Sequence, residues 1–298
     1  MDDRLTIPTD LVERLIADHF PQFSSLAVQP LVPGGWDNRS FRLGLQMIIR
    51  LPSAQSYEAQ VAKEQRFLPL LAPHLPLPIP EPVAMGRPGH GYPFCWGIYR
   101  WISGETALSA DITDRDQFAV DLAGFLKILH RMDGGDGPPA GAHNFYRGGS
   151  LATYDQESRA AIDQLGEDID ADRALSLWEQ ALASQWQKPP VWLHGDIAPG
   201  NLLVDNGRLA AIIDFGCCGT GDPACDLAIA WTFMDRAIAA RFRATLDHDE
   251  ATWTRARGWA LWKTLITLQK QVETGAPEAT ESRIVLERIL AEDHANKA

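Results

Sequence analysis

The chain has 298 residues, of which 45% are hydrophobic and 22% are charged, a composition that favours a folded globular protein over extended disorder. No apolar run reaches the ~18 residues of a membrane-spanning helix, and the acidic N-terminus has no apolar segment typical of a secretory signal. With four cysteines in so long a chain, we expect a reduced, cytoplasmic protein that does not bind membranes.

The net charge of −12 is unevenly distributed. Residues 1–102 carry 9 basic and 9 acidic side chains, so the whole imbalance lies in residues 103–298, which carry 18 and 30. An acidic surface disfavours nucleic acid as a partner, because carboxylates and phosphates repel each other. The acidic C-terminal part has two open interpretations, which are solubility and attraction of a cationic small molecule.

The first third of the chain predicts a small region rich in short strands. In chain order the expected elements are a helix over residues 8–20, strands over 26–32, 40–43 and 47–51, a helix over 57–71, an extended proline-rich connector over 73–82 and a strand over 94–101. A turn is expected at Pro33-Gly34-Gly35. Pro69 is expected to end or bend the second helix, because proline lacks the N–H that a helix uses.

After residue 102 the pattern becomes mainly helical. The expected elements are helices over residues 114–132, 151–165, 172–185 and most of the chain after 223, with short strands over 191–193, 202–204 and 209–213. The sequence therefore predicts an α+β protein with two lobes. Residues 1–102 would form a β-rich lobe, and residues 103–298 would form a larger helical lobe.

The strongest chemical signal is the segment 194–201, HGDIAPGN, followed by a predicted hairpin and by IDFG at 213–216. Asp196 and Asn201 have the spacing of the kinase catalytic loop, and Asp214 opens a DFG motif. Phosphoryl transfer needs one carboxylate to accept or orient a hydroxyl, and a second carboxylate with an amide oxygen to hold Mg²⁺. The alternative is that both aspartates cap turns and His194 is an ordinary core histidine.

These motifs, together with GDPACDLA at 221–228, closely resemble the aminoglycoside phosphotransferase family over nearly the whole chain. That family shares a bilobal, protein-kinase-like fold with choline, homoserine and methylthioribose kinases and with macrolide phosphotransferases. The resemblance implies a nucleotide-binding lobe that ends in a hinge (1–102) and a catalytic, acceptor-binding lobe (103–298). It implies a catalytic base at Asp196, Mg²⁺ ligands at Asn201 and Asp214, and support of the catalytic loop by His194 and Asp226. For Asp226, a charge at a helix N-terminus is the alternative.

The resemblance also implies that the N-terminal lobe binds ATP or GTP. Gly34 and Gly35 would let the backbone approach the phosphates, and Ser40 or the Asn38 side chain would add a hydrogen bond. An ordinary Gly-Gly turn is the alternative. At the hinge, the backbone C=O of Arg100 and N–H of Ile102 would meet the purine edge.

Arg50 departs from the family pattern, which has a lysine on this strand to hold the α- and β-phosphates. Arginine can bind phosphate bidentately, but its guanidinium does not superpose on an ammonium. The expected partner of Arg50 is Glu64, with Glu58 as the competitor and a solvated helix face as the alternative for Glu64. Lys63 is expected to point elsewhere.

Two further features limit the function. Position 195 is glycine where protein kinases have arginine. In addition, few residues separate Gly216 from the Gly-Asp-Pro segment at 221–223. Because this leaves little room for a long activation segment, a protein substrate is not expected. Cys217, Cys218 and Cys225 with His194 do not have the spacing of a structural zinc site, so we expect buried thiols.

The sequence thus predicts a cytoplasmic, Mg²⁺-dependent kinase that uses ATP or GTP and phosphorylates a hydroxyl of a small cationic molecule. Aminoglycoside-like aminosugars are the first expectation, and macrolides, choline or homoserine are the alternatives. An alternative of another class is a nucleotide-binding module without catalysis, which the unusual Arg50 favours and the intact Asp196, Asn201 and Asp214 disfavour.

Overall fold

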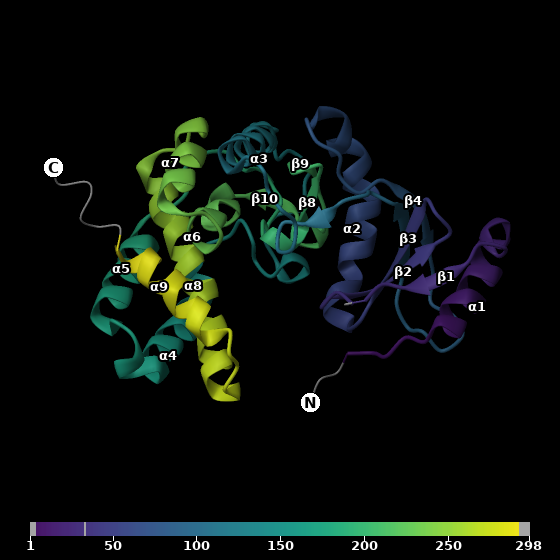
Figure 1. Cartoon of the computed structure of the whole chain (residues 1–298), viewed down its shortest axis with the longest axis horizontal. Helices are drawn as coiled ribbons and strands as arrows, with labels where there is room; N and C mark the ends of the chain where they lie inside the picture. The colour runs from purple at the N-terminus through teal and green to yellow at the C-terminus, as the bar shows by residue number, and fades with distance from the viewer. Residues whose placement is uncertain (1–3, 33, 292–298) are drawn as a thin grey trace.

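The computed structural model describes residues 4–32 and 34–291. Its N-terminal part, defined here as the described residues up to 102, is built on a five-stranded antiparallel sheet in the order β1-β2-β3-β5-β4 (Figure 1). The elements are helices α1 (Thr9–His19) and α2 (Gln55–Leu71) and strands β1 (Val28–Pro30), β2 (Asn38–Leu43), β3 (Met47–Pro52), β4 (Pro82–Gly86) and β5 (Trp96–Arg100). The helices and strands expected in this part are all present in the expected order, and β4 is an additional strand.

The two faces of this sheet have different surroundings, because successive side chains of a strand point to opposite faces. The odd-numbered Phe41 and Leu43 of β2 and Ile49 of β3 pack with α1 in one apolar cluster. The even-numbered Ser40 and Arg50 are paired across β2 and β3 and belong to the opposite face. Polar side chains of β2 and β3 are therefore turned toward the rest of the molecule.

The helical part, defined as residues 103–291, follows the sheet. Its helices are α3 (Arg115–Leu129), α4 (Asp155–Leu165), α5 (Ala171–Ala183), α6 (Ile229–Thr232), α7 (Arg236–Thr245), α8 (Glu250–Thr274) and α9 (Ala279–Ala291). Its strands β6 (Glu105–Thr106), β8 (Leu202–Asp205) and β9 (Arg208–Ile212) form one small sheet, and β7 (Val191–Leu193) pairs with β10 (Gly219–Gly221). No helix among the described residues is long and apolar enough to cross a membrane.

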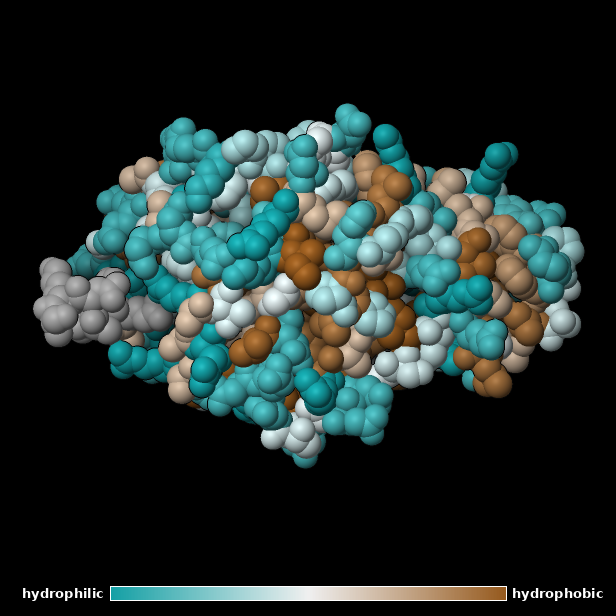
Figure 2. All heavy atoms as spheres, turned by 90° about the horizontal axis from the view of Figure 1, so that it is seen from above, coloured by the Kyte–Doolittle hydropathy of each residue, from teal (hydrophilic) through white to brown (hydrophobic). Residues whose placement is uncertain are grey.

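A second apolar cluster joins the two parts. Phe67 and Leu68 of α2 and Tyr99 of β5 belong to the same cluster as the core of α3, α5 and α8. In Figure 1, α2 accordingly lies between the sheet and the helical part, whereas α1 covers the outer side. Figure 2 shows mainly hydrophilic atoms over the helical part, and hydrophobic atoms gathered near the middle and over the N-terminal part. The boundary at residues 102/103 stays a prediction.

Several local expectations were wrong. Pro69 does not end α2, which continues for two more residues to Leu71. The proline removes the N–H that would bond to the carbonyl of residue 65, a loss of one helical hydrogen bond. The strands β4, β6 and β10 were not expected, and β4 begins with Pro82, an end position where proline is tolerated. The first turn of the helix expected over 151–165 is a 3₁₀ helix, Leu151–Tyr154. Pro33, in the expected turn, lies outside the described residues.

Candidate active site

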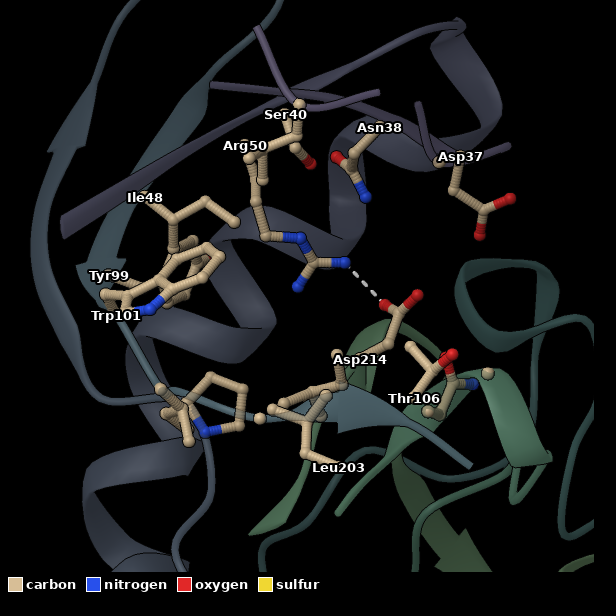
Figure 3. Close-up of a pocket in the computed structure, with 18 of the residues that line it drawn as sticks. Asp37, Asn38, Ser40, Ile48, Arg50, Tyr99, Trp101, Thr106, Leu203 and Asp214 are labelled. Atoms are coloured by element: carbon tan, nitrogen blue, oxygen red, sulfur yellow. Dashed lines mark hydrogen bonds and ion pairs between the residues drawn. The ribbon is translucent and has the colours of Figure 1, made fainter. Parts of the chain in front are cut away.

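A cavity of about 370 Å³ lies between the sheet and the helical part (Figure 3). Side chains from β2, β3 and β5, the connecting segment after β5 and the loops around β8 and β9 line it. Eight of the residues expected from the sequence line this cavity: Gly35, Asn38, Ser40, Arg50, Arg100, Ile102, Asn201 and Asp214. Gly34 and Glu64 do not line it, and Asp196 lines a small adjacent pocket.

The guanidinium of Arg50 lies within this cavity and connects two carboxylates. One terminal nitrogen of its guanidinium donates to Glu64 Oε1 at 3.0 Å, and the other donates to Asp214 Oδ1 at 2.5 Å, the contact drawn in Figure 3. Tyr99 donates its hydroxyl to Glu64 Oε2 at 2.6 Å, so both oxygens of this buried carboxylate are used. Burial lowers the pKa of Arg50, but the carboxylates of Asp214 and Glu64 outweigh it and raise the pKa above its usual range.

The competitor Glu58 and the neighbouring Lys63, both on α2, make other contacts. Glu58 accepts a hydrogen bond from the side chain of Gln55 and another from the backbone N–H of Cys95. Lys63 lies 3.1 Å from the imidazole Nδ1 of His143. The structure therefore pairs Arg50 with Glu64.

Asp226 holds the backbone of the loop 194–201, which we call the catalytic loop. Its fully buried carboxylate accepts the backbone N–H groups of His194 at 2.8 Å and Gly195 at 2.7 Å. The ring of His130 lies within 3.0 Å of the same carboxylate. A carboxylate that receives two backbone donors fixes both the position and the orientation of that loop.

His194 links the catalytic loop to the strand end that carries Asp214. Its Nδ1 accepts the backbone N–H of Asp196 at 3.1 Å, and its Nε2 lies 3.0 Å from the carbonyl oxygen of Ile213. Because Nδ1 accepts, Nε2 carries the proton and donates. One buried imidazole thus sets the spacing between Asp196 and Asp214.

Position 195 has to be glycine for two structural reasons. Gly195 has φ +85°, a conformation that side chains disfavour, and a Cβ placed there would lie 2.3 Å from the carbonyl oxygen of Cys217. By contrast, Gly34 and Gly35 do not have positive φ, and a Cβ at Gly34 would meet nothing nearer than 3.9 Å. Gly34 is therefore less constrained than Gly195, whereas a Cβ at Gly35 would lie 3.1 Å from the carbonyl oxygen of Asn38.

Asp196 is held from two sides. The Asn201 side chain donates from Nδ2 to the main-chain oxygen of Asp196 at 2.9 Å and to its Oδ2 at 3.1 Å. The ammonium of Lys263, from α8, donates to Oδ1 at 2.9 Å. Burial raises the pKa of Asp196, but Lys263 outweighs it and holds that pKa below its usual value. Asp196 is therefore ionised and fixed.

The donor set at the cavity fits a Mg²⁺ ion that also binds a nucleotide. Asn201 uses its Nδ2 on Asp196, which leaves its oxygen available, and Asp214 lines the same cavity. Burial and the carboxylates of Asp214 and Asp196 raise the pKa of Asp37 to about 6, a concentration of negative charge that a divalent cation would relieve. No three His, Cys, Asp or Glu residues in the described ranges form a metal cage by themselves. Mg²⁺ commonly takes one or two carboxylates and completes its shell with phosphates and water.

The sequence analysis missed Asp37, Lys263 and Tyr99. Asp37 lies two residues after Gly35, but its distance in sequence from the other carboxylates forms no recognisable motif. Lys263 lies on a helix 67 positions after Asp196, so no local motif connects the two. The expected burial of the thiols is confirmed: Cys217, Cys218 and Cys225 are free and buried.

Comparison with known proteins identifies a matching family profile and several similar structures. The sequence profile described as "Phosphotransferase enzyme family" matches residues 28–259, whereas no curated protein sequence matches the chain. An aminoglycoside 2″-phosphotransferase bound to GDP and kanamycin is 20% identical, with a TM-score of 0.72 over 95% of this chain and 99% of that one. These values confirm the expected kinase-like fold.

Two other solved structures match this chain over a similar share of its length. The macrolide 2′-phosphotransferase MphH from Brachybacterium faecium is 21% identical, with a TM-score of 0.62 over 93% of this chain and 97% of that one. An aminoglycoside phosphotransferase APH(4)-Ia variant with ADP and hygromycin B is 19% identical, with a TM-score of 0.63 over 94% and 97%. The fold is thus common to proteins with chemically different acceptors.

Proposed function

The chain belongs to the Phosphotransferase enzyme family, and on this premise we propose that it is a Mg²⁺-dependent kinase of a small-molecule hydroxyl, with ATP or GTP as the phosphate donor. One observation carries the proposal. Asp214 and Asn201 line the large cavity, and Asn201 also holds Asp196. A metal-bound phosphate and an orienting carboxylate would therefore meet at the catalytic loop.

The cavity would take the nucleotide. The backbone of Arg100 and Ile102 would bind the purine edge, and Gly34, Gly35 and Ser40 would lie near the phosphates. Arg50, held by Glu64 at 3.0 Å, would contact the α- and β-phosphates in place of the lysine of the family pattern. This assignment makes residues 1–102 the nucleotide-binding lobe and residues 103–298 the catalytic, acceptor-binding lobe.

Catalysis would consist of positioning and charge neutralisation. Asp214 and Asn201 would hold Mg²⁺, which neutralises charge on the β- and γ-phosphates. Asp196 would orient the acceptor hydroxyl for in-line attack and take its proton. His194 and Asp226 would support this arrangement through the backbone bonds described above.

The acceptor is proposed to be cationic and aminoglycoside-like. The charge of −12 on residues 103–298 and the relatives solved with kanamycin and hygromycin B support this choice. Arg147 and Lys263 line the pocket at Asp196, so the ammonium groups of such an acceptor would bind farther from the reacting hydroxyl. Macrolides, choline and homoserine are the alternative acceptors, and a protein substrate is not proposed.

A cytoplasmic location is part of the proposal, because ATP and GTP are available there and the four free cysteines would stay reduced. If an aminoglycoside antibiotic proves to be the acceptor, resistance to that compound would be the cellular phenotype.

The decisive experiment measures Mg²⁺-dependent release of ADP or GDP with kanamycin, hygromycin B, a macrolide, choline, homoserine and neutral sugars, and uses Asp196→Asn as the control. Acceptor-stimulated release that disappears in the control is the expected result. Nucleotide binding without release for any compound would favour the non-catalytic module. A neutral sugar that outperforms every amine would reject the cationic acceptor.

A further inference from the structure

The catalytic loop lacks a positive charge of its own. Its eight residues, HGDIAPGN, include no lysine or arginine, although a transferring phosphoryl group must pass close to the Asp196 carboxylate. On the nucleotide side, Arg50 is bound to Glu64 and Asp214. A cation for the acceptor side of the reaction has to come from another element.

Among the described residues that line the pocket at Asp196, two are cationic, and their surroundings differ. Arg147 donates from Nε to the carbonyl oxygen of Gly195 at 3.1 Å, and its Nη1 donates to the carbonyl oxygen of Phe145 and the hydroxyl of Tyr154. Its guanidinium also lies 4.6 Å from the ring centre of Trp262. These contacts make Arg147 a fixed part of the loop's support.

Lys263 differs from Arg147 in its exposure and in its contacts. Its Nζ lies 2.9 Å from Asp196 Oδ1, and its side chain is 43% exposed. Because an ammonium on a flexible stem can rotate, Lys263 can keep one hydrogen bond to Asp196 and turn another N–H toward a second anion. The helix that carries it does not depend on it, since α8 is anchored by buried residues that include Trp259, Leu261 and Leu265.

We propose that Lys263 is a catalytic residue that binds a non-bridging oxygen of the phosphoryl group during transfer. This inference rests on the proposed kinase function. As the acceptor oxygen forms its bond to the γ-phosphorus, the bond from that phosphorus to the β–γ bridging oxygen breaks, and the leaving nucleoside diphosphate keeps the electron pair. The hydroxyl proton goes to Asp196. Lys263 offsets the repulsion between the phosphoryl oxygens and the Asp196 carboxylate.

A purely structural role explains the contact less well. Asn201 already holds Asp196 through two hydrogen bonds, and an exposed ion pair contributes little to stability. A blocking role, in which Lys263 occupies Asp196 until an acceptor displaces it, predicts the opposite change in activity when Lys263 is removed. Experiment can therefore separate the three roles.

The test uses Lys263→Met, Lys263→Arg and the control Lys188→Met, whose exposed ammonium pairs with Asp249. The first measurement is the affinity of Mg²⁺ with ADP or GDP, with and without aluminium fluoride, which mimics a transferring phosphoryl group. In Lys263→Met we expect the affinity for the diphosphate alone to be unchanged. The increase in affinity that aluminium fluoride produces, which we call the aluminium fluoride gain, should be smaller by roughly 10²-fold, the usual cost of one charge-stabilising donor. Lys263→Arg should recover part of that gain, and Lys188→Met should keep it all.

The second measurement is nucleotide hydrolysis without acceptor. Slower hydrolysis in Lys263→Met at unchanged KM supports the proposal, whereas faster hydrolysis would assign a blocking role and overturn it. An equal aluminium fluoride gain in wild type and Lys263→Met, lost only in Asp196→Asn, overturns the role of Lys263 and leaves the kinase function standing. A wild-type protein that shows no such gain overturns both.

Discussion

Arg50 and Asp214 form a direct ion pair of 2.5 Å between strand β3 of the N-terminal part and the segment after β9 in the helical part. The same guanidinium binds Glu64 on the opposite side at 3.0 Å. One arginine therefore connects helix α2, strand β3 and a proposed metal ligand. A single lysine ammonium does not have the planar fork that makes both contacts at once.

The first prediction concerns this bridge. Arg50→Met leaves the buried Glu64 carboxylate without its charge partner, which should lower the free energy of unfolding by about 3 kcal/mol and weaken nucleotide binding. Arg50→Lys should cost less in both respects. Urea unfolding and nucleotide titration measure the two effects.

The double variant Arg50→Met/Glu64→Gln is the matched control for the stability effect. Neutralising Glu64 removes the uncompensated charge, so this variant should be more stable than Arg50→Met alone and still bind nucleotide poorly. If the double variant were the less stable of the two, the buried charge would not be the cause of the loss.

The second prediction concerns the support of the catalytic loop. An asparagine at position 226 has one oxygen where Asp226 uses two to accept the N–H groups of His194 and Gly195. Asp226→Asn should therefore lower the free energy of unfolding by about 3 kcal/mol, because a charge-assisted buried bond is lost and a backbone donor is left unpaired. Thermal and urea unfolding measure this loss.

A control at the surface distinguishes this loss from a general effect of removing a carboxylate. Asp168, which makes a 3.5 Å surface pair with Arg283, should tolerate replacement by asparagine with a loss below about 0.5 kcal/mol. Nucleotide turnover should also fall more than nucleotide affinity in Asp226→Asn, since the loop and not the cavity is disturbed. Equal losses of stability in the two variants would reject the supporting role.

The sequence was informative where function depends on short spacing. Asp196, Asn201 and Asp214 belong to two short motifs separated by one hairpin, so local pattern was enough to predict that they would lie together. Lys263 and Asp37 were not predicted because their proximity to Asp196 comes from packing of distant segments, which one sequence does not reveal. The short strands β4, β6 and β10 were missed for a similar reason: each is defined by its pairing partner more than by its own residues.

The third prediction separates backbone strain from collision at two glycines. Gly195 and Gly275 both have positive φ, +85° and +65°, but an added Cβ meets the Cys217 carbonyl oxygen at 2.3 Å in the first and nothing within 4 Å in the second. Gly275→Ala should cost about 1 kcal/mol, the price of the left-handed conformation alone. Gly195→Ala should cost clearly more and reduce turnover, because the catalytic loop must move. Equal losses of unfolding free energy in the two variants would show that the structure relieves the collision at position 195.

The fourth prediction concerns acid stability and the ring of His248. Its Nε2 lies 3.1 Å from Nδ1 of His130, whose Nε2 lies 3.0 Å from Asp226. Burial first, and then the proximity of His130 and Lys188, lowers the pKa of His248 from 6.5 to about 4. The unfolded chain therefore binds a proton at this site between pH 6.5 and 4 where the folded protein does not, so stability falls as the pH decreases through this range.

The size of this effect follows from the shift. Between pH 7.5 and pH 5, His248 should lower the free energy of unfolding by about 2 kcal/mol, since each pKa unit of displacement corresponds to about 1.4 kcal/mol. Urea unfolding of wild type and His248→Gln at both pH values isolates this contribution, because the carboxylates titrate alike in both proteins. The pH-dependent loss should be smaller by this amount in the variant. His74→Gln, at an exposed histidine after α2, should leave the loss unchanged, and an identical loss in wild type and His248→Gln would contradict the assignment.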